Sequence, residues 1–259
     1  MPATSATAAP APQLAAATRI VKREDGCLQV GIRPEATVCI RDTPAARRAL
    51  DDIARGERCD RQHPDLLAAL SQAGLFTTPR PPGRYPVRIL GSLDGNLATA
   101  LRWSGLEANA QARLALVLSL GELDRRVLDP LIRSDVPHLI VRALDGVIVL
   151  GPFVVPGETA CLRCLDTYSA DEDPCYLTTL DRYVRACAQP REDGCLDIVN
   201  PGDAALALAW ATRDLREYAT GGIPTTWSTT IVIGDPSAPL NAVTWKPHPD
   251  CGCHWTSLA

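Results

Sequence analysis

Four cysteines stand in two close pairs at widely separated points of this 259-residue chain. Cys161 and Cys164 form a Cys-x-x-Cys within VVPGETACLRCLD, while Cys251 and Cys253 form a Cys-Gly-Cys within HPDCGCHW near the C-terminus. Both pairs lie in turn-rich sequence, where the short spacing lets two sulfurs point to one side of the backbone. Four such thiolates are typical of a closed, tetrahedral zinc site. The two pairs therefore predict a structural zinc clip that ties the end of the chain to an earlier loop.

Other interpretations of these thiols stay open. A Cys-x-x-Cys alone could be a redox motif, and a Cys-x-Cys alone is a weak signal, so the pairs could also be unrelated. His248 and His254 flank the second pair and could replace a thiolate as ligands. Four protein ligands leave no open position for a substrate, so the predicted metal site is structural and not catalytic.

Composition points to an ordinary globular protein. The chain is 46% hydrophobic and 22% charged, and its net charge of -4 gives no general reason to expect a nucleic acid partner. The first stretch, MPATSATAAPAPQLAAAT, lacks the basic and apolar regions of a signal peptide, and no later segment reaches the length of a membrane span. We therefore expect a disordered tail over 1–18, no membrane partner, and a cytoplasmic location in which the thiols stay reduced.

Residues 19–78 predict a small winged-helix-like unit. RIVKREDGCLQVGIRPEATVCIRD alternates apolar and polar residues around turn signals, which predicts a three-stranded meander over about 19–41. Two helices follow: the first is capped by Thr43 with Pro44 in its first turn, and the second lies in HPDLLAALSQAGLF. The residues that carry these patterns are Leu28, Val30, Ile32, Val38 and Ile40 on the strands, and Leu50, Ile53, Leu66, Leu67 and Leu70 on the helices.

The proline-rich stretch TTPRPPGRYP predicts a linker over 79–86, followed by a second domain over 87–259. The segments VRIL, LALVLSL, HLIVRA and VIVLG read as buried strands that alternate with turns and helical stretches. This alternation predicts an α/β domain with a parallel, Rossmann-like sheet. A helical stretch over about 122–128 is expected to be interrupted at Pro130. A long helix over 203–218 and a hairpin then lead to the Cys-Gly-Cys end.

A nucleotide site is not expected in the second domain. The first strand-helix junction, LGSLDGNLATAL, contains Gly91 and Gly95 but no Gly-x-Gly-x-x-Gly that would let backbone amides approach a phosphate. Asp94 places a negative charge where that phosphate would lie. Only about 20 residues separate the start of this helix from LALVLSL, which predicts that the second strand and its ribose-binding acidic residue are absent. No ATP is therefore expected as a cofactor.

These segments together resemble a known family. DVPHLIVRALDGVIVLGPFVVPGETACLRCLDTYSADEDP, with the final HPDCGCHW, resembles the ThiF-like, or E1-like, partner proteins of YcaO cyclodehydratases in thiazole/oxazole-modified microcin and thiopeptide biosynthesis. DGCLQVGIRP and LLAALSQAGLF resemble the peptide-recognition element that precedes such domains. The resemblance covers about 19–259 and implies a truncated E1/ThiF-like domain behind a recognition element. It also implies a homodimer whose YcaO-type partner, not this chain, uses the ATP.

In relatives the small unit binds the leader of a ribosomally made precursor peptide, which adds as a strand to a sheet edge and packs against a helix. The resemblance therefore implies a non-catalytic scaffold that presents the precursor for azoline or azole formation. Plain core packing is the alternative role for each candidate residue, and RGERCDRQH leaves little room for the usual middle helix. The residues implied to bind the peptide are Thr37, Val38, Cys39, Ile40, Leu66, Leu67 and Leu70.

Two other function classes stay open. One is an E1-like adenylating enzyme with a degenerate nucleotide loop, which ATP-dependent pyrophosphate exchange would reveal. The other is a winged-helix DNA-binding regulator. Between Arg19 and Pro79 ten basic and nine acidic residues give 10 - 9 = +1, which is a weak field for a phosphate backbone.

Overall fold

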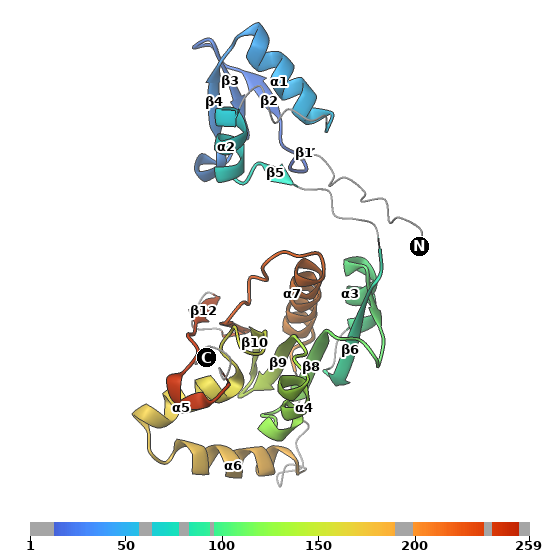
Figure 1. The fold of residues 1–259 in the computed structure, drawn as a ribbon, viewed down its shortest axis with the longest axis vertical. Helices are drawn as coiled ribbons and strands as arrows, with labels where there is room; N and C mark the ends of the chain where they lie inside the picture. Colours follow the sequence, from blue (N-terminus) through green and yellow to red (C-terminus); the bar gives the residue numbers. More distant parts are fainter. Residues whose placement is uncertain are drawn as a thin grey trace, which may run out of the picture. The chain divides into compact units, whose positions relative to one another are not determined.

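The computed structural model describes residues 13–56, 64–77, 83–93, 96–189, 199–235 and 240–253. The chain divides into two compact units, residues 1–81 and 82–259 (Figure 1). In the described parts of the chain, no helix combines the length and the apolar composition that crossing a membrane requires.

The first unit is built on an antiparallel sheet in the order β2-β3-β4, so the predicted meander is present. Its strands are β2 (Ile20–Lys22), β3 (Cys27–Val30) and β4 (Val38–Arg41), with a 3-10 turn, η1 (Pro34–Ala36), before β4. The helices are α1 (Pro44–Ala54) and α2 (Pro64–Gln72). They cover the inner face of the sheet, where Leu28, Val30, Leu50, Ile53 and Leu70 form the core.

The start of α1 follows the sequence signal directly. The Thr43 hydroxyl accepts a hydrogen bond from the backbone N–H of Ala46 at 3.1 Å, and Pro44 occupies the first turn, where it needs no N–H partner. Two expectations for this unit are wrong. Ile32 lies beyond the end of β3 and is 83% exposed, because the strand ends at Val30. The expected tail is ordered from Gln13, since β1 (Gln13–Leu14) pairs with β5 (Phe76–Thr77).

The second unit contains a seven-stranded mixed sheet in the order β12-β11-β10-β9-β8-β6-β7. The contacts of β6 with β7 and β8, and of β8 with β9, are parallel, whereas the pairs from β9 to β12 are antiparallel. The predicted parallel sheet is therefore only half of the observed one. Its strands are β6 (Tyr85–Gly91), β7 (Leu106–Ala108), β8 (Ala115–Leu120), β9 (His138–Leu144), β10 (Val147–Val154), β11 (Thr229–Ile233) and β12 (Asn241–Thr244).

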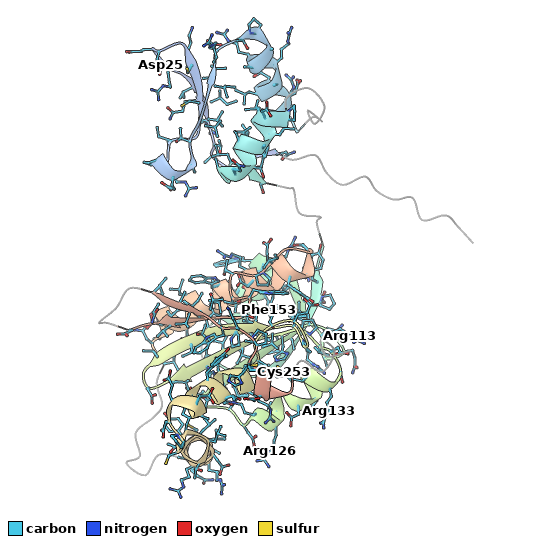
Figure 2. All side chains as sticks on the ribbon, turned by 60° about the vertical axis from the view of Figure 1, so that its left-hand side comes forward. Asp25, Arg113, Arg126, Arg133, Phe153 and Cys253 are labelled. Carbon is cyan, nitrogen blue, oxygen red and sulfur yellow. The ribbon has the colours of Figure 1, made fainter. Side chains whose placement is uncertain are left out.

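Helices cover both faces of this sheet, as Figure 1 shows with α3 and α7 on one side and α4, α5 and α6 on the other. The first face carries the larger core, to which Phe153 belongs (Figure 2). The second face carries a smaller core that includes Cys161 and Cys164. The helices are α3 (Leu97–Ser104), α4 (Asp129–Arg133), α5 (Leu162–Glu172), α6 (Tyr176–Cys187) and α7 (Pro201–Ala219), with 3-10 turns η2 (Arg125–Val127) and η3 (Pro249–Cys251).

Two further expectations need correction. A second strand does follow the first helix: β7 is three residues long, pairs in parallel with β6 and carries the exposed Glu107. Three residues suffice because β7 only has to extend the edge of the sheet. Pro130 does not interrupt a helix either. It lies in the first turn of α4, where proline is well tolerated.

Candidate functional site

The structure brings the two cysteine pairs together. The Cys161 and Cys164 sulfurs lie 3.8 Å apart, Cys161 and Cys251 3.6 Å, and Cys164 and Cys253 3.3 Å. All four Sγ atoms lie within 4.8 Å of one another. Figure 2 labels Cys253, the last of the four.

These distances fit a tetrahedral thiolate site. A metal-sulfur bond of about 2.3 Å in a tetrahedron places neighbouring sulfurs about 3.8 Å apart. The separations of 3.3 to 3.8 Å lie near that value. In contrast, two disulfides would need sulfur pairs at about 2.05 Å. The cluster can therefore hold one metal ion such as zinc.

The first pair is positioned by the start of α5. Cys161 is the residue before the helix, and Cys164 completes its first turn by donating its N–H to the Cys161 carbonyl at 3.0 Å. The loop before α5 is held next to the start of β11, since the Ala160 N–H donates to the hydroxyl of Ser228, the residue before β11, at 2.9 Å. Both thiols are consequently buried, Cys164 completely.

The second pair is positioned by the turn η3. Cys251 ends η3, and Gly252 follows with a φ of 71°, a left-handed conformation that glycine adopts without a side-chain clash. The chain therefore reverses between Cys251 and Cys253, and both sulfurs reach the same point. Gly252 is the residue that makes so short a spacing usable.

His248 is not a ligand in this arrangement. Its Nε2 lies 2.9 Å from the Asp171 carboxylate on α5, and its Nδ1 accepts the Asp250 N–H at 3.1 Å. Its ring also packs edge-on against Tyr168 with the centroids 4.6 Å apart. His248 therefore fastens the chain end to α5 without touching the cluster through its ring nitrogens. The other histidine considered, His254, lies outside the described residues.

The pKa values of the cluster thiols shift in opposite directions. Hydrogen bonds from Cys161, Cys251 and Cys253 lower the pKa of Cys164, whereas the bonds to Cys161 and Cys164 raise the pKa of Cys251. A bound metal would override these shifts by stabilising all four thiolates.

A buried ion-pair network joins α5 to the ends of the parallel strands. Arg125 binds the Asp166 carboxylate of α5 through two bonds of 2.7 Å and the Glu122 carboxylate through one of 2.5 Å. The second Glu122 oxygen accepts a bond of 2.6 Å from Arg142 on β9. All four side chains are no more than 10% exposed. The charges are thus mutually satisfied inside the protein, as buried ions require.

This network occupies a position that often binds ligands in α/β proteins. The strand order reverses between β6 and β8, and ligands usually bind beyond the carboxyl ends of strands at such a point. Glu122 follows the carboxyl end of β8, and it faces two arginines instead of open solvent. A cavity of about 830 Å³ opens beside it, lined also by Leu177 and Val184 of α6.

The network predicts a pH effect on stability. Burial raises the pKa of Glu122, but the charges and hydrogen bonds of Arg142 and Arg125 outweigh burial and hold it below the ordinary 4.5. The unfolded chain therefore takes up this proton first as the pH falls, so the stabilisation is complete above pH 4.5 and is lost below it. We expect the free energy of unfolding of Glu122→Gln to fall less steeply at acid pH than that of the parent protein. Urea titrations at several pH values measure this acid limb of the stability curve.

The exposed Glu107 gives a matched control for this effect. Glu107→Gln should leave the acid limb of the stability curve as it is in the parent protein. An acid limb of equal slope in Glu122→Gln and the parent would contradict the assigned role of Glu122.

The first strand-helix junction of this unit, where no nucleotide site is expected, is only partly described, because Asp94 and Gly95 lie outside the described residues. Gly91 has a φ of 79°, and a Cβ there would lie 2.0 Å from the Leu118 carbonyl oxygen. The glycine is therefore explained by close packing of β6 against β8. It needs no phosphate to account for it.

The predicted peptide-binding residues fall into two groups. Leu66 and Leu70 are 8% and 0% exposed and belong to the core of the first unit, while Leu67 is half-buried beside them. Thr37, Val38 and Ile40 are half-buried too, and Cys39 is exposed. The first group supports the sheet from behind. Of the second, Val38, Cys39 and Ile40 lie in the outer strand β4, whereas Thr37 directly precedes it.

Backbone groups of β4 point away from the sheet. The Asp42 N–H donates to Gly26 at 3.0 Å, which makes these two residues a hydrogen-bonded pair. Because such pairs alternate along antiparallel strands, Val38 and Ile40 bond to β3, whereas Cys39 and Arg41 direct their N–H and C=O groups outward. Within the described part of the chain, no strand pairs with this outer edge.

The sequence patterns did not predict the ion-pair network. One signal was available: Arg142 interrupts the apolar run HLIVRA, and a charge within a buried strand requires a partner. Asp166, two residues after the Cys-x-x-Cys, gave no comparable signal, since its partner lies 41 positions away.

No protein-family model and no curated protein matches this chain. Solved structures do match. The heterocyclase TruD is 16% identical with a TM-score of 0.61, over 94% of this chain and 42% of that one. A heterocyclase in complex with substrate and cofactor is 17% identical with a TM-score of 0.62, over 94% and 39%.

The E. coli protein MccB also matches. Its structure with MccA-N7isoASN is 12% identical with a TM-score of 0.54, over 94% of this chain and 99% of that one. MccB is a microcin C7 biosynthetic enzyme, solved also with N-formylated MccA. The chain thus spans less than half of the heterocyclase chains but nearly all of MccB. At these identities the similarity establishes a shared fold.

Proposed function

We propose that this chain is a non-catalytic leader peptide-binding scaffold in the biosynthesis of a ribosomally made, azole-containing peptide. It binds the leader of a precursor peptide and presents the precursor to a YcaO-type, ATP-dependent cyclodehydratase. The cysteine cluster holds a structural zinc ion, and the first unit acts as a winged-helix-like recognition element.

The observation that carries this proposal is the outer edge of β4. Cys39 and Arg41 offer backbone donors and acceptors that pair with no strand in the described part of the chain, which is the arrangement needed for strand addition. The shared fold with MccB and TruD is consistent with a role in peptide modification. The core leucines of α2 stabilise the edge strand indirectly in this scheme.

The ion-pair network supports the absence of nucleotide chemistry in this chain. Glu122 would be the natural carboxylate for a metal-bound phosphate at the end of β8, but Arg125 and Arg142 already bind both of its oxygens. Releasing it would leave two buried guanidinium groups without a partner, which is strongly unfavourable.

An E1-like adenylating enzyme is the second candidate function. The strand β7 favours it, because Glu107 lies on a second parallel strand, where dinucleotide-binding folds place a ribose-binding carboxylate. ATP-dependent pyrophosphate exchange by the purified chain with a precursor peptide would support this candidate. We expect no exchange above background.

Leader binding is tested most sharply at Cys39. Cys39→Pro removes an N–H that points outward, so the β3–β4 ladder remains while strand addition is blocked. We expect the affinity for a fluorescein-labelled leader peptide, from a precursor encoded beside this chain, to fall by about tenfold or more. That change corresponds to about 1.4 kcal/mol, the scale of one lost hydrogen bond plus steric exclusion. Fluorescence anisotropy measures it.

Cys39→Ser is the matched control, because it changes the exposed side chain and keeps the backbone N–H. It should bind the leader as the parent does. Equal binding by Cys39→Pro and Cys39→Ser would contradict strand addition at β4, and no binding by the parent would contradict the scaffold function.

A further inference from the structure

The first unit contains a pocket of about 410 Å³ at the end of the sheet where β3 passes into β4. It is formed by residues 16–19 and Val21 of β2, by the β3–β4 connection and by Leu75 in the segment between α2 and β5. This volume is in the range of small-ligand sites and is large enough for a bulky side chain. The position adjoins the start of β4, the strand whose outer edge is proposed to bind the leader.

The pocket is mainly apolar. Leu75 and Ala36 are 5% and 2% exposed and form its base. Val21 and Ile32 also line it but are 47% and 83% exposed. Large apolar side chains this exposed, gathered around one hollow, indicate a surface that is covered in a complex.

The charge of the lining has one sign. Arg19 and Arg33 line the pocket, and no acidic residue does so within the described part of the chain. Arg33 forms an exposed ion pair with Glu35 at 3.1 Å, whereas the Arg19 guanidinium donates to the Thr18 carbonyl at 3.2 Å. Arg19 in particular remains available for a carboxylate, which would be attracted to the rim.

The walls are held in place by the backbone. Ala17 has a φ of 62°, which is unusual for a residue with a side chain, and it lies in a turn closed by a 3.0 Å bond from the Thr18 N–H to Ala15. The Ala15 N–H donates in turn to Leu75 at 2.8 Å. Across the pocket, a Cβ on Gly31 would lie 2.5 Å from the Ala36 carbonyl oxygen. The pocket is therefore preformed.

We infer that this pocket binds a large apolar side chain of an acidic peptide, with a carboxylate of the same peptide paired to Arg19. The inference rests on the proposed function, since the peptide is the leader bound along the β4 edge. The pocket adds selectivity, because an edge strand alone recognises any extended backbone. The expected leader has an aliphatic or aromatic residue flanked by aspartate or glutamate.

The test uses the full chain and the fluorescein-labelled leader peptide. Ile32→Asp and Arg19→Glu should each lower the affinity at least tenfold, because both side chains are exposed and their replacement does not disturb the core. Arg48→Glu makes the same charge change on the exposed face of α1, outside the pocket, and should bind as the parent does. A second leader peptide has its acidic residues changed to amides. The parent protein should bind this peptide more weakly than the unchanged leader, whereas Arg19→Glu should bind it at least as tightly as the unchanged leader.

The outcomes separate the two proposals. If Cys39→Pro abolishes binding while Ile32→Asp and Arg19→Glu bind like the parent, the pocket inference is wrong and the scaffold function stands. If the parent binds no leader, the scaffold function fails. Equal losses in Arg19→Glu and Arg48→Glu would show a general charge effect and would also overturn the pocket.

Discussion

Cys161→Ser is expected to abolish zinc binding and to lower the melting temperature of the second unit by about 8–16 °C. Zinc present at a thousandfold excess over its dissociation constant adds about 4 kcal/mol to the free energy of unfolding. For a unit of this size, each kcal/mol shifts the melting temperature by about 2–4 °C. Because Cys161 lies next to both Cys164 and Cys251 in the cluster, its loss leaves only three thiolates for the ion.

Elemental analysis and differential scanning calorimetry measure the two effects on one sample. Cys175→Ser is the matched control, because Cys175 is exposed and lies outside the cluster. It should retain one zinc per chain and the parent melting temperature. Full zinc content with unchanged melting in Cys161→Ser would rule out the four-thiolate site. Partial retention would point to a replacement ligand such as His254.

The cysteine cluster was predictable because metal ligation leaves a local signature. Cysteine pairs with one or two intervening residues are rare, and each pair needs only its own turn, as Gly252 illustrates. A metal ion bound by all four thiolates would join the pairs. The pairing across 90 positions therefore follows from ligand chemistry without knowledge of the fold.

Helix caps and alternating strands were also predictable, because their signals lie in neighbouring residues. Thr43 and Pro44, for example, define the start of α1 within one turn. Mixed sheet topology was only partly predictable. The Asp145-Gly146 turn between β9 and β10 is a typical hairpin signal, and a hairpin was expected for β11 and β12. The antiparallel pairing of β10 with β11, however, joins segments that lie far apart in the sequence. The strand β7 was missed since three residues show no alternation. The four-residue spacing of Tyr176, Leu180 and Val184 does predict a helix, so α6 was within reach of sequence reasoning.

The ion-pair network could not be read from sequence, and it limits the role expected of a metal at the cysteine cluster. Cys161 and Cys164 fix the first turn of α5, Asp166 fixes its middle through Arg125, and Asp171 binds His248. Contacts at its first turn, its middle and its last turn therefore hold α5 in place. A metal held by the four thiols would secure the chain end, while the network secures α5 against the sheet.

Arg125→Ala should accordingly destabilise the zinc-loaded protein by about 3–5 kcal/mol, the usual cost of removing one partner from a buried ion pair. The substitution leaves the carboxylates of Asp166 and Glu122, which are 8% and 7% exposed, without their shared guanidinium. At about 2–4 °C per kcal/mol the melting temperature should fall by about 6–20 °C. Arg125→Lys should recover only part of this loss, since an ammonium group cannot form the two parallel bonds to Asp166.

The neighbouring Arg126 provides the control. It forms an ion pair with Asp124 but is 82% exposed, so Arg126→Ala should leave the melting temperature unchanged (Figure 2). Zinc content should stay at one per chain in both variants, because neither arginine touches a thiol. If Arg125→Ala and Arg126→Ala melted alike with zinc bound, the network would contribute nothing to the position of α5. The proposed block of nucleotide chemistry at Glu122 would then lose its energetic basis, since Glu122 could be released from its arginines at little cost.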